Sequence, residues 1–320
     1  MEQQWHASIA TDLTKVDAII NDALRSDRPE LQQMCDYVIT SGGKKIRPSM
    51  CILAHRACGG RGDDILNVAS AFEMVHCATL VHDDINDKSE IRRGRKAVHE
   101  KYTVTKALIL GDFMFAIGFK LISSTDKEII DAMVTASKAM AESEFIQKDL
   151  EHESVVTEED YLNIIRGKTA MPIFACAKTG AYLAGADNDT VNAISEFALN
   201  VGLAFQIVDD ILDIVGDHRN TGKKAGTDIS EGKPTLPVIY AMSDKVHGSR
   251  IKEIFRKADP SDDDVQEALR LIRSTDSVDK CMLKAKDIVE AAIPLLSRIE
   301  DSVYKDSLIN LARFVVSRDR

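Results

Sequence analysis

Apolar residues recur at spacings of three and four along almost the whole chain, which is the period of an amphipathic helix rather than of a strand. No segment shows the strict alternation of a half-buried strand, and no low-complexity linker divides the chain. Clusters of turn-forming residues interrupt the helical pattern near positions 26, 42, 58, 185 and 258. The pattern therefore predicts one all-α domain, a large helical bundle covering residues 1–320.

Two predicted helices carry a start signal, and one break is unusually long. Thr157 followed by Asp160, and Ser261 followed by Asp264, match the capping box that begins a helix. The longest break covers residues 216–234, is rich in glycine and lysine, and directly follows an apolar helix. Loops of this length inside a compact domain are usually functional, so we expect a binding loop or a lid there.

Aspartates occur in one pattern within two otherwise apolar stretches, LVHDDINDKSEI at 80–91 and FQIVDDILDIV at 205–215. In a helix, the first and third aspartates of each motif stack on one face, about 5.4 Å apart along the axis. Burying a carboxylate in apolar surroundings costs free energy unless a cation lies beside it. These aspartates are Asp83, Asp84 and Asp87 in the first motif and Asp209, Asp210 and Asp213 in the second.

Mg²⁺ is the cation that this spacing favours. It prefers hard oxygen ligands, binds one or two carboxylates, and completes its octahedron with water and substrate phosphate. A single motif of this kind ordinarily means only that acidic residues face the solvent. Two copies with apolar flanks favour a metal site instead. The middle residues, Asp84 and Asp210, have the alternative role of supporting their neighbours.

Basic residues near the turns form a second constellation. Arginine binds phosphate oxygens bidentately, and lysine contributes a mobile point charge. Each alone is ordinarily a solvated surface charge, but together with two acidic motifs they indicate a site for two polyanionic substrates or one very large one. They are Lys44 and Arg47 in GGKKIRP, Arg92 and Arg93 in IRRGRK, Lys168 in RGKTA, and Lys223, Lys224 and Lys233 in or beside the long break.

Length, charge and cysteine content narrow the class of protein. A chain of 320 residues can form one large domain or two small ones. Its net charge of −10 argues against nucleic acid or an anionic membrane surface as the main partner. The six cysteines form no CxxC pair, which suits buried thiols in a reducing cytoplasm. The N-terminus lacks the features of a signal peptide, and no apolar run approaches about 18 residues, so we expect a cytoplasmic protein without a transmembrane segment.

Several motifs follow one another in a characteristic order between residues 40 and 240: GGKKIRP, EMVHCATLVHDDINDKSEIRRG, LILGD, RGKTA and FQIVDDILDIVGD…GKKAGTDISEGKPTLP. In this set the chain resembles the trans-isoprenyl diphosphate synthases, which make farnesyl, geranylgeranyl and longer all-trans polyprenyl diphosphates. It departs at Lys45, Ile46 and Thr103, where the family commonly has Arg, Leu and Gly. The resemblance implies the all-helical isoprenoid synthase fold, a homodimer, and a deep central cavity with the two aspartate motifs facing each other near its mouth.

The resemblance also implies an activity and its substrates. The protein would be a Mg²⁺-dependent prenyltransferase that condenses isopentenyl diphosphate with an allylic diphosphate, head to tail, into an all-trans polyprenyl diphosphate. Isopentenyl diphosphate would be bound by Lys44, Arg47, His76 and Arg93. His76 has the alternative of being a satisfied core residue, because it lies on an apolar helix.

The allylic diphosphate would lie between the two aspartate motifs. Asp83 and Asp87 would bind Mg²⁺ on one wall and Asp209 on the other, with about three Mg²⁺ ions in the active site. Asp84, Asp210 and Asp213 complete the candidate metal ligands. The remaining implied contacts to this substrate are Arg92, Lys168, Lys223 and Lys233, with Thr169 and Gln206 beside the developing allylic cation.

Product length depends on the residues that precede the first motif on its helix. Ala78 and Thr79 lie about one turn before Asp83, where short-chain members of the family carry bulky aromatic residues. Because both side chains are small, we expect a product of about five to eight isoprene units. The alternative is that a residue on the helix bearing Phe145 and Ile146 forms the floor, which gives geranylgeranyl or farnesyl diphosphate.

Three other classes of protein fit the sequence less well. A class I terpene cyclase normally has a mixed Asn/Ser/Glu second metal site, whereas the second motif here is DDILD. A non-catalytic regulatory subunit of the same fold would have lost motif residues, and none is missing. A ferritin-like metal bundle needs Glu-x-x-His pairs on facing helices, which His152 and His218 do not supply.

Overall fold

The computed structural model describes residues 4–216 and 225–317. Contacts between Cα atoms divide the chain into two compact units, each assembled from three separate segments. The first unit comprises Met1–Thr135, Pro172–Ala198 and Leu295–Leu311, and the second comprises Ala136–Met171, Leu199–Pro294 and Ala312–Arg320.

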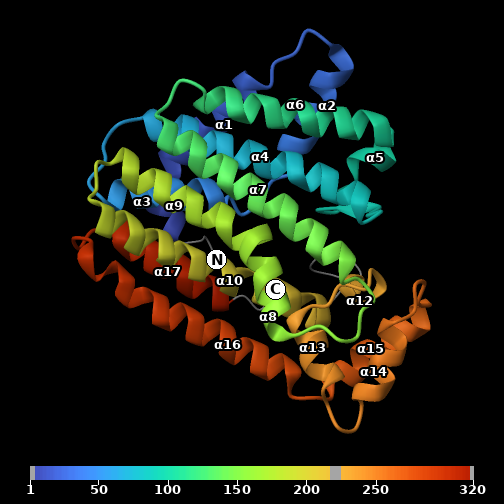
Figure 1. The fold of residues 1–320 in the computed structure, drawn as a ribbon. Coiled ribbons are helices and arrows are strands. Elements are labelled where there is room, and N and C mark those ends of the chain that lie inside the picture. The colour runs from blue at the N-terminus through green and yellow to red at the C-terminus, as the bar shows by residue number, and fades with distance from the viewer. Residues whose placement is uncertain (1–3, 217–224, 318–320) are drawn as a thin grey trace. The chain divides into compact units, whose positions relative to one another are not determined.

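The predicted all-α fold is confirmed, because nearly all regular structure in the described residues is helical (Figure 1). The first unit holds η1 (Gln4–Ile9), α1 (Ala10–Ala23), α2 (Pro29–Ile39), α3 (Ile46–Ala57), α4 (Asp64–Asn86), β1 (Ile91–Arg92), β2 (Arg95–Lys96), α5 (Val98–Lys101) and α6 (Val104–Ile122). The second unit holds α8 (Glu158–Ile165), η2 (Arg166–Ala170), α12 (Thr227–Ser230), α13 (Leu236–Met242), α14 (Gly248–Phe255), α15 (Asp262–Arg273) and α16 (Ser277–Ala292). Each unit contains part of α7 (Lys127–Asp149), α9 (Met171–Leu183), α10 (Asn188–Val215), η3 (Ile293–Arg298) and α17 (Val303–Ser317).

Both predicted capping boxes are confirmed. The Thr157 hydroxyl accepts a hydrogen bond of 3.1 Å from the backbone N–H of Asp160, whose carboxylate accepts one in return from the Thr157 N–H. The Ser261 hydroxyl accepts in the same way from Asp264 at 3.2 Å. Each box satisfies backbone donors that the first turn of a helix leaves without intrahelical partners, which is why α8 and α15 begin at these residues.

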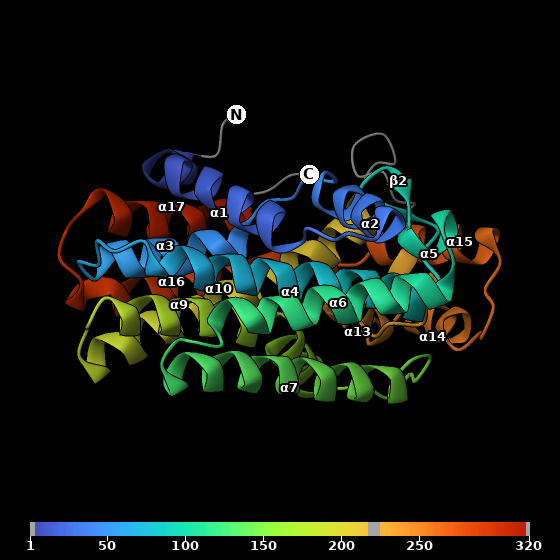
Figure 2. The same cartoon turned by 90° about the horizontal axis from the view of Figure 1, so that it is seen from above.

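The core of the first unit is the pairing of α4 with α6, which run side by side in both views (Figures 1 and 2). Two glycines of α6 make this close approach possible. A Cβ atom on Gly118 would lie 2.9 Å from Cγ2 of Val75, and one on Gly111 would lie 2.1 Å from Nε2 of His82. Helix α4 is long and apolar enough to cross a membrane, but 67% of its most apolar window is buried inside the protein, as in a core helix.

A short hairpin follows the first aspartate motif, where no strand was predicted. Strands β1 and β2 pair antiparallel, with Arg92 opposite Arg95. The two turn residues, Arg93 and Gly94, have φ angles of 51° and 73°, as a tight type I′ turn requires. Strands of two residues are too short to show an alternating pattern, so the sequence signal could not reveal them.

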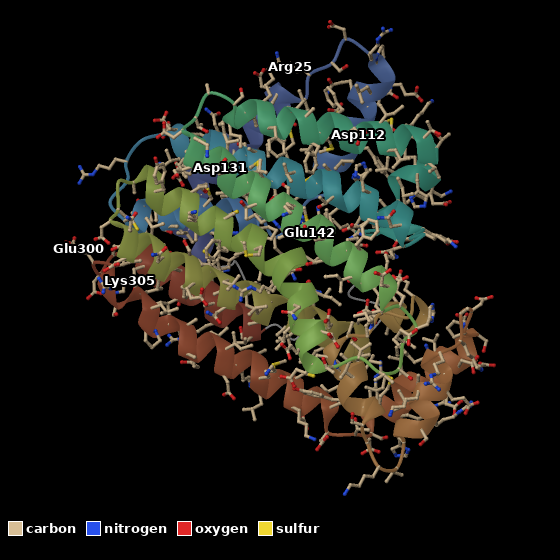
Figure 3. The ribbon with its side chains drawn as sticks, in the orientation of Figure 1. Arg25, Asp112, Asp131, Glu142, Glu300 and Lys305 are labelled. Atoms are coloured by element: carbon tan, nitrogen blue, oxygen red, sulfur yellow. The ribbon has the colours of Figure 1, made fainter. Side chains whose placement is uncertain are left out.

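Charged residues occupy the exposed faces of the helices. The side chains of Asp112 on α6 and Glu142 on α7, both labelled in Figure 3, are 80% and 63% exposed. In the second unit, the apolar residues of the second aspartate motif face inward, and Ile207, Val208 and Ile211 are at most 1% exposed. The aspartates of this helix segment are therefore flanked by buried apolar side chains.

Candidate functional site

The residues predicted to bind isopentenyl diphosphate gather in the first unit. A Cβ atom on Gly43 would lie 2.9 Å from Nη2 of Arg93, so the loop that carries Lys44 lies directly against that guanidinium group. Burial lowers the pKa of Arg47, and the carboxylate of Glu73 opposes this shift. Burial also holds the pKa of His76 well below its usual 6.5, and the positive charges of Arg47, Arg93 and Arg92 lower it further. His76 is therefore a neutral imidazole beside a cluster of arginines.

In the first aspartate motif, the middle residue holds an arginine. The Asp84 side chain is 3% exposed, and its Oδ1 accepts hydrogen bonds from Nε and Nη2 of Arg92 at 2.8 and 2.5 Å. Asp83 and Asp87 are half-buried, one helical turn apart. This arrangement favours a supporting role for Asp84, as the alternative interpretation of the sequence allowed, and it orients Arg92.

The second aspartate motif lies in the second unit and also uses its middle residue internally. Asp210 is 4% exposed; its Oδ2 accepts a hydrogen bond from Tyr161 Oη at 2.6 Å, and its Oδ1 accepts one from Gln206 Nε2 at 2.8 Å. Burial, reinforced by the charge of Asp228, raises the pKa of Asp210 well above its usual value. The carboxylate of Asp213 accepts hydrogen bonds from the backbone N–H groups of Thr227 and Asp228 at 3.2 and 3.1 Å.

The two hydrogen bonds accepted by Asp213 therefore connect the start of α12 to the end of α10. Asp209, the remaining aspartate of the motif, is half-buried. Of the residues in the long break, Lys223 and Lys224 lie outside the described residues, whereas Lys233 is described.

A cavity of about 110 Å³ in the second unit collects the residues predicted around the allylic diphosphate. Thr169 Oγ1 donates a hydrogen bond of 2.7 Å to Gln206 Oε1, which joins the two residues expected beside the allylic cation. The cations are oriented by carboxylates, because Lys168 Nζ lies 2.5 Å from Glu144 and Lys233 Nζ lies 2.6 Å from Glu231. Predicted residues that line this cavity are Lys168, Thr169, Gln206, Asp210 and Lys233.

Local backbone geometry explains where Lys168 lies. The segment η2 is a single turn of π-helix between α8 and α9, a geometry found often at functional sites. A Cβ atom on Gly167 would lie 1.9 Å from Ser143 Oγ and 2.7 Å from the backbone oxygen of Ala139. Only glycine permits this approach of η2 to α7, and the approach brings Lys168 to Glu144.

Four residues at this site were missed by sequence reasoning. Gln147, Tyr161 and Asp228 line the cavity, and Glu144 is the ion-pair partner of Lys168. Gln147 is 9% exposed and Tyr161 is 3% exposed. A signal did exist: Glu144 and Gln147 are polar residues three apart on α7, so they share a face. The same pattern also describes a solvated helix face, which is why it was not decisive.

The two residues predicted to control product length differ in exposure. Ala78 is fully buried, whereas Thr79 is half-buried and donates its hydroxyl to the backbone oxygen of His76 at 2.9 Å. On a helix, Thr79 is displaced from Asp83 by about 40° and Ala78 by about 140°. Thr79 therefore lies closer to the face of α4 that carries His76 and Asp83.

The donor set of the first motif is compatible with a divalent cation. Asp83 and Asp87 offer hard carboxylate oxygens at one-turn spacing, the chemistry that Mg²⁺ and Ca²⁺ prefer. Within residues 4–216 and 225–317, the side chains form no group of three or more His, Cys, Asp or Glu residues able to hold a metal by themselves. An ion at this motif would therefore depend on oxygens from water and from a substrate.

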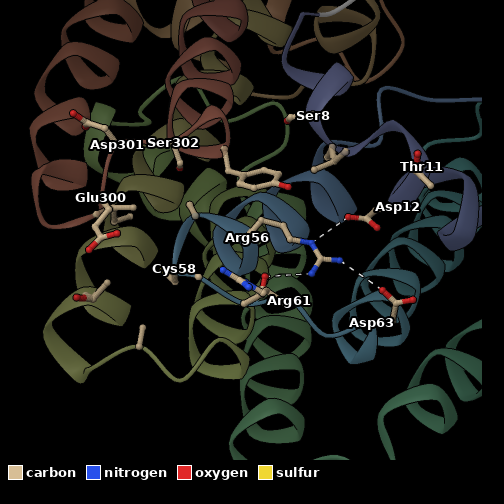
Figure 4. A pocket seen from close by; sticks show the side chains of 18 of the residues that line it. Ser8, Thr11, Asp12, Arg56, Cys58, Arg61, Asp63, Glu300, Asp301 and Ser302 are labelled. Carbon is tan, nitrogen blue, oxygen red and sulfur yellow. Dashed lines mark hydrogen bonds and ion pairs between the residues drawn. The ribbon is translucent and has the colours of Figure 1, made fainter.

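The largest cavity described is not the predicted site. It has a volume of about 970 Å³, lies in the first unit, and contains none of the predicted residues (Figure 4). Its main cation, Arg56, is used structurally: Nε lies 3.2 Å from Asp12, Nη2 lies 3.7 Å from Asp63, and Nη1 donates to the Gly60 carbonyl at 3.2 Å. Volume alone would therefore select a cavity that lacks the predicted basic and acidic motif residues.

Comparison with known proteins agrees with the resemblance inferred from the motifs. The family model described as Polyprenyl synthetase matches residues 28–272. The all-trans-nonaprenyl-diphosphate synthase (geranyl-diphosphate specific) of Rhodobacter capsulatus is 34% identical, over 99% of this chain and 98% of that protein. The geranylgeranyl diphosphate synthase of Methanosarcina mazei is also 34% identical, over 95% of each chain.

A solved structure is also closely similar to this chain. The crystal structure of polyprenyl synthase from Caulobacter crescentus, complexed with calcium and isoprenyl diphosphate, matches with a TM-score of 0.95 at 32% identity, over 99% of this chain and 98% of that one. The predicted family is therefore confirmed by sequence and by fold. The chain belongs to the polyprenyl synthetase family, a family of prenyltransferases.

Proposed function

We propose that this chain condenses isopentenyl diphosphate with an allylic diphosphate, head to tail, and releases an all-trans polyprenyl diphosphate of about five to eight isoprene units. The observation that carries the proposal is the cavity of the second unit, where Lys168, Thr169, Gln206 and Lys233 surround Asp210 of the second aspartate motif. Basic side chains beside a carboxylate motif suit a diphosphate that arrives with divalent metal.

The cations would stabilise the leaving group. Arg92, Lys168 and Lys233 would each offer positive charge to the negative charge that develops as the allylic C–O bond breaks. Mg²⁺, about three ions held by Asp83, Asp87 and Asp209, would supply further Lewis-acid stabilisation of that charge.

Thr169 and Gln206 would face the allylic carbon. Because the Thr169 hydroxyl donates a hydrogen bond to Gln206 Oε1, the lone pairs of its own oxygen remain available to a positive centre. The double bond of isopentenyl diphosphate then forms the new C–C bond, and a proton leaves the adjacent carbon. We assign this proton to the released diphosphate, which carries negative charge beside the reacting carbon.

Lys44, Arg47, His76 and Arg93 would hold isopentenyl diphosphate. The neutral imidazole of His76 can donate one hydrogen bond to a phosphate oxygen without adding a charge to the arginine cluster. This division would give each diphosphate its own set of cations.

The proposed product length rests on the small side chains of Ala78 and Thr79, which precede the first motif on its helix. Similarity alone does not decide it, because relatives named for nonaprenyl and for geranylgeranyl products are equally identical to this chain. The alternative product, geranylgeranyl or farnesyl diphosphate, would require a bulkier floor elsewhere.

We further propose a homodimer and a cytoplasmic location. Exposed apolar residues on α6 support the dimer, because Val104, Leu108 and Ile109 are 49%, 44% and 56% exposed. Sedimentation of the purified protein would test the dimer.

Turnover of labelled isopentenyl diphosphate with each allylic primer, followed by sizing of the dephosphorylated products, tests the reaction. Asp83→Ala and Asp209→Ala should each lower turnover by about a hundredfold or more while circular dichroism shows the helical fold intact, because each removes a metal ligand. Asp301→Ala, at a position whose side chain is 98% exposed and lies outside the motifs, is the matched control and should retain activity. Near-normal turnover of either motif variant at saturating Mg²⁺ would refute the metal assignment.

A further inference from the structure

A second group of cations lies in the first unit, outside the residues assigned to catalysis. It surrounds an open cavity of about 680 Å³ between α2, the hairpin and α5. Its basic side chains are Arg95, Lys96 and Lys101, all exposed. Within the described residues, none of these three forms an ion pair, and the one carboxylate of the cavity wall, Asp36, accepts instead from Gln32 at 2.8 Å.

Neutral groups hold two of these cations, Lys101 and Arg95, in place. Lys101 Nζ lies 3.6 Å from the centroid of the Tyr37 ring and 5.3 Å from that of Tyr102. The Arg95 guanidinium lies 5.6 Å from the Tyr37 ring centroid and donates a hydrogen bond of 3.1 Å to the Thr40 hydroxyl. Tyr37 is itself fixed, because its hydroxyl donates to the Lys96 carbonyl at 2.8 Å and its ring packs edge-on to Tyr102.

This arrangement differs from ordinary surface lysines. Three positive charges line one cavity, and aromatic rings and a hydroxyl, rather than carboxylates, orient two of them, Lys101 and Arg95. An anionic ligand would therefore reduce the repulsion among these three cations. Such a basic cluster is notable in a protein whose net charge is −10. An anion bound there would gain charge-assisted hydrogen bonds without first breaking an ion pair.

The cavity also adjoins the candidate isopentenyl diphosphate site. Tyr37, Arg95 and Lys96 line both this cavity and a smaller one, of about 40 Å³, whose wall includes Arg92 and Arg93. We propose that Arg95, Lys96 and Lys101 form a second anion site, which binds the phosphate or diphosphate group of a soluble ligand or of a lipid headgroup. The site does not depend on the proposed reaction.

Labelling with pyridoxal 5′-phosphate tests the site, because this probe carries a phosphate and forms a reducible imine with lysine. After borohydride reduction and peptide mapping, Lys96 and Lys101 should be labelled several-fold faster by pyridoxal 5′-phosphate than by pyridoxal, and inorganic diphosphate should protect them. Lys138, whose side chain is 72% exposed, is the control and should show neither effect. Arg95→Ala should reduce the preference at Lys96 and Lys101 toward that of Lys138.

Labelling of Lys44 in the same digest reports the candidate active site separately, so loss of one site is distinguishable from loss of the other. Sedimentation with phosphatidylglycerol or phosphatidylcholine vesicles separates the two sources of phosphate. Binding to the anionic vesicles that Lys96→Glu and Lys101→Glu abolish assigns the site to a lipid headgroup, and diphosphate protection without vesicle binding assigns it to a soluble ligand. Equal labelling of Lys96, Lys101 and Lys138, with no protection by diphosphate, would overturn the proposal.

Discussion

Several side chains of the candidate site are held in place by a hydrogen bond or ion pair to a second residue. Arg92 is oriented by Asp84, Lys168 by Glu144, and Asp210 by Tyr161. Buried polar groups that are fully hydrogen-bonded keep one geometry, and loss of a partner leaves the other group desolvated and unmatched. The precision of the site therefore depends on these partners.

Tyr161→Phe tests this dependence by removing one donor to buried Asp210. We expect the KM for the allylic substrate to rise by about tenfold, which corresponds to about 1.4 kcal/mol, while the KM for isopentenyl diphosphate stays unchanged. Tyr240→Phe is the matched control, because Tyr240 donates to Glu158 at 2.6 Å but does not line the cavity. Equal effects of the two substitutions on the allylic KM would mean that Tyr161 has only a structural role.

Thr79→Phe tests the assignment of product length. Thr79 is half-buried and close in angle to Asp83, so a phenyl ring there should shorten the product with little loss of total turnover. Ala78→Phe should also shorten it, but Ala78 is fully buried, so overpacking should cost about 1–3 kcal/mol of stability as well. Reverse-phase chromatography of the products and thermal unfolding of both variants provide the measurements. An unchanged product ladder for Thr79→Phe would remove the chain-length proposal and leave the reaction class untouched.

Some residues of the candidate site could be predicted from the sequence, and others could not. Lys168, Thr169, Gln206 and Lys233 could be predicted because they belong to motifs of fixed spacing, and the structure brings them to one cavity. Glu144 could not be predicted, because a glutamate on an amphipathic helix is ordinarily solvated and only the close approach of η2 to α7 shows otherwise.

At the scale of elements, the functional geometry comes from contacts between helices. Helix boundaries could be predicted where turn residues cluster or a capping box begins, as at Ser261. The π-helical turn η2 could not be predicted, because its conformation is supported by the packing of Gly167 on α7 rather than by local propensity. The hairpin after the first motif could not be predicted, because its strands of two residues are too short to show an alternating pattern.

Gly167→Ala tests the contact between η2 and α7. The added Cβ atom would meet Ser143 Oγ and the Ala139 carbonyl, so η2 must shift, and we expect about 1–3 kcal/mol of destabilisation with a raised allylic KM. Denaturant unfolding and steady-state kinetics measure the two effects. Adding Ser143→Gly removes one of the two clashes and should restore part of both losses. If the double variant were no better than Gly167→Ala, the close approach would not be the cause.

At the scale of the whole molecule, charge is distributed unevenly. The chain as a whole is acidic, with a net charge of −10, yet a small cavity of the first unit is lined by Arg92, Arg93, Arg95 and Lys96 and by one carboxylate, that of Asp84. Composition predicts the first property, and the motifs together with the fold reveal the second. The charges that line a site therefore decide which ligand it binds, whereas the net charge of the whole chain bears on its solubility.

The division of each unit among three chain segments has a consequence for how the protein is made. The first unit includes Leu295–Leu311, and Ser8 Oγ lies 2.8 Å from Ser307 Oγ across 299 positions of sequence. A ribosome must therefore deliver the chain as far as Leu311 before this unit can close, and such distant contacts slow folding and prolong exposure of apolar surface.

Trp5 is the sole tryptophan of the sequence and is 1% exposed within the first unit, so its fluorescence reports when that unit is complete. A chain terminated after residue 294 should show a red-shifted, solvent-quenched Trp5 emission, and the full chain should recover the native emission only in a slow refolding phase. Native emission from the shortened chain would mean that the N-terminal segments fold vectorially, before the last helix emerges.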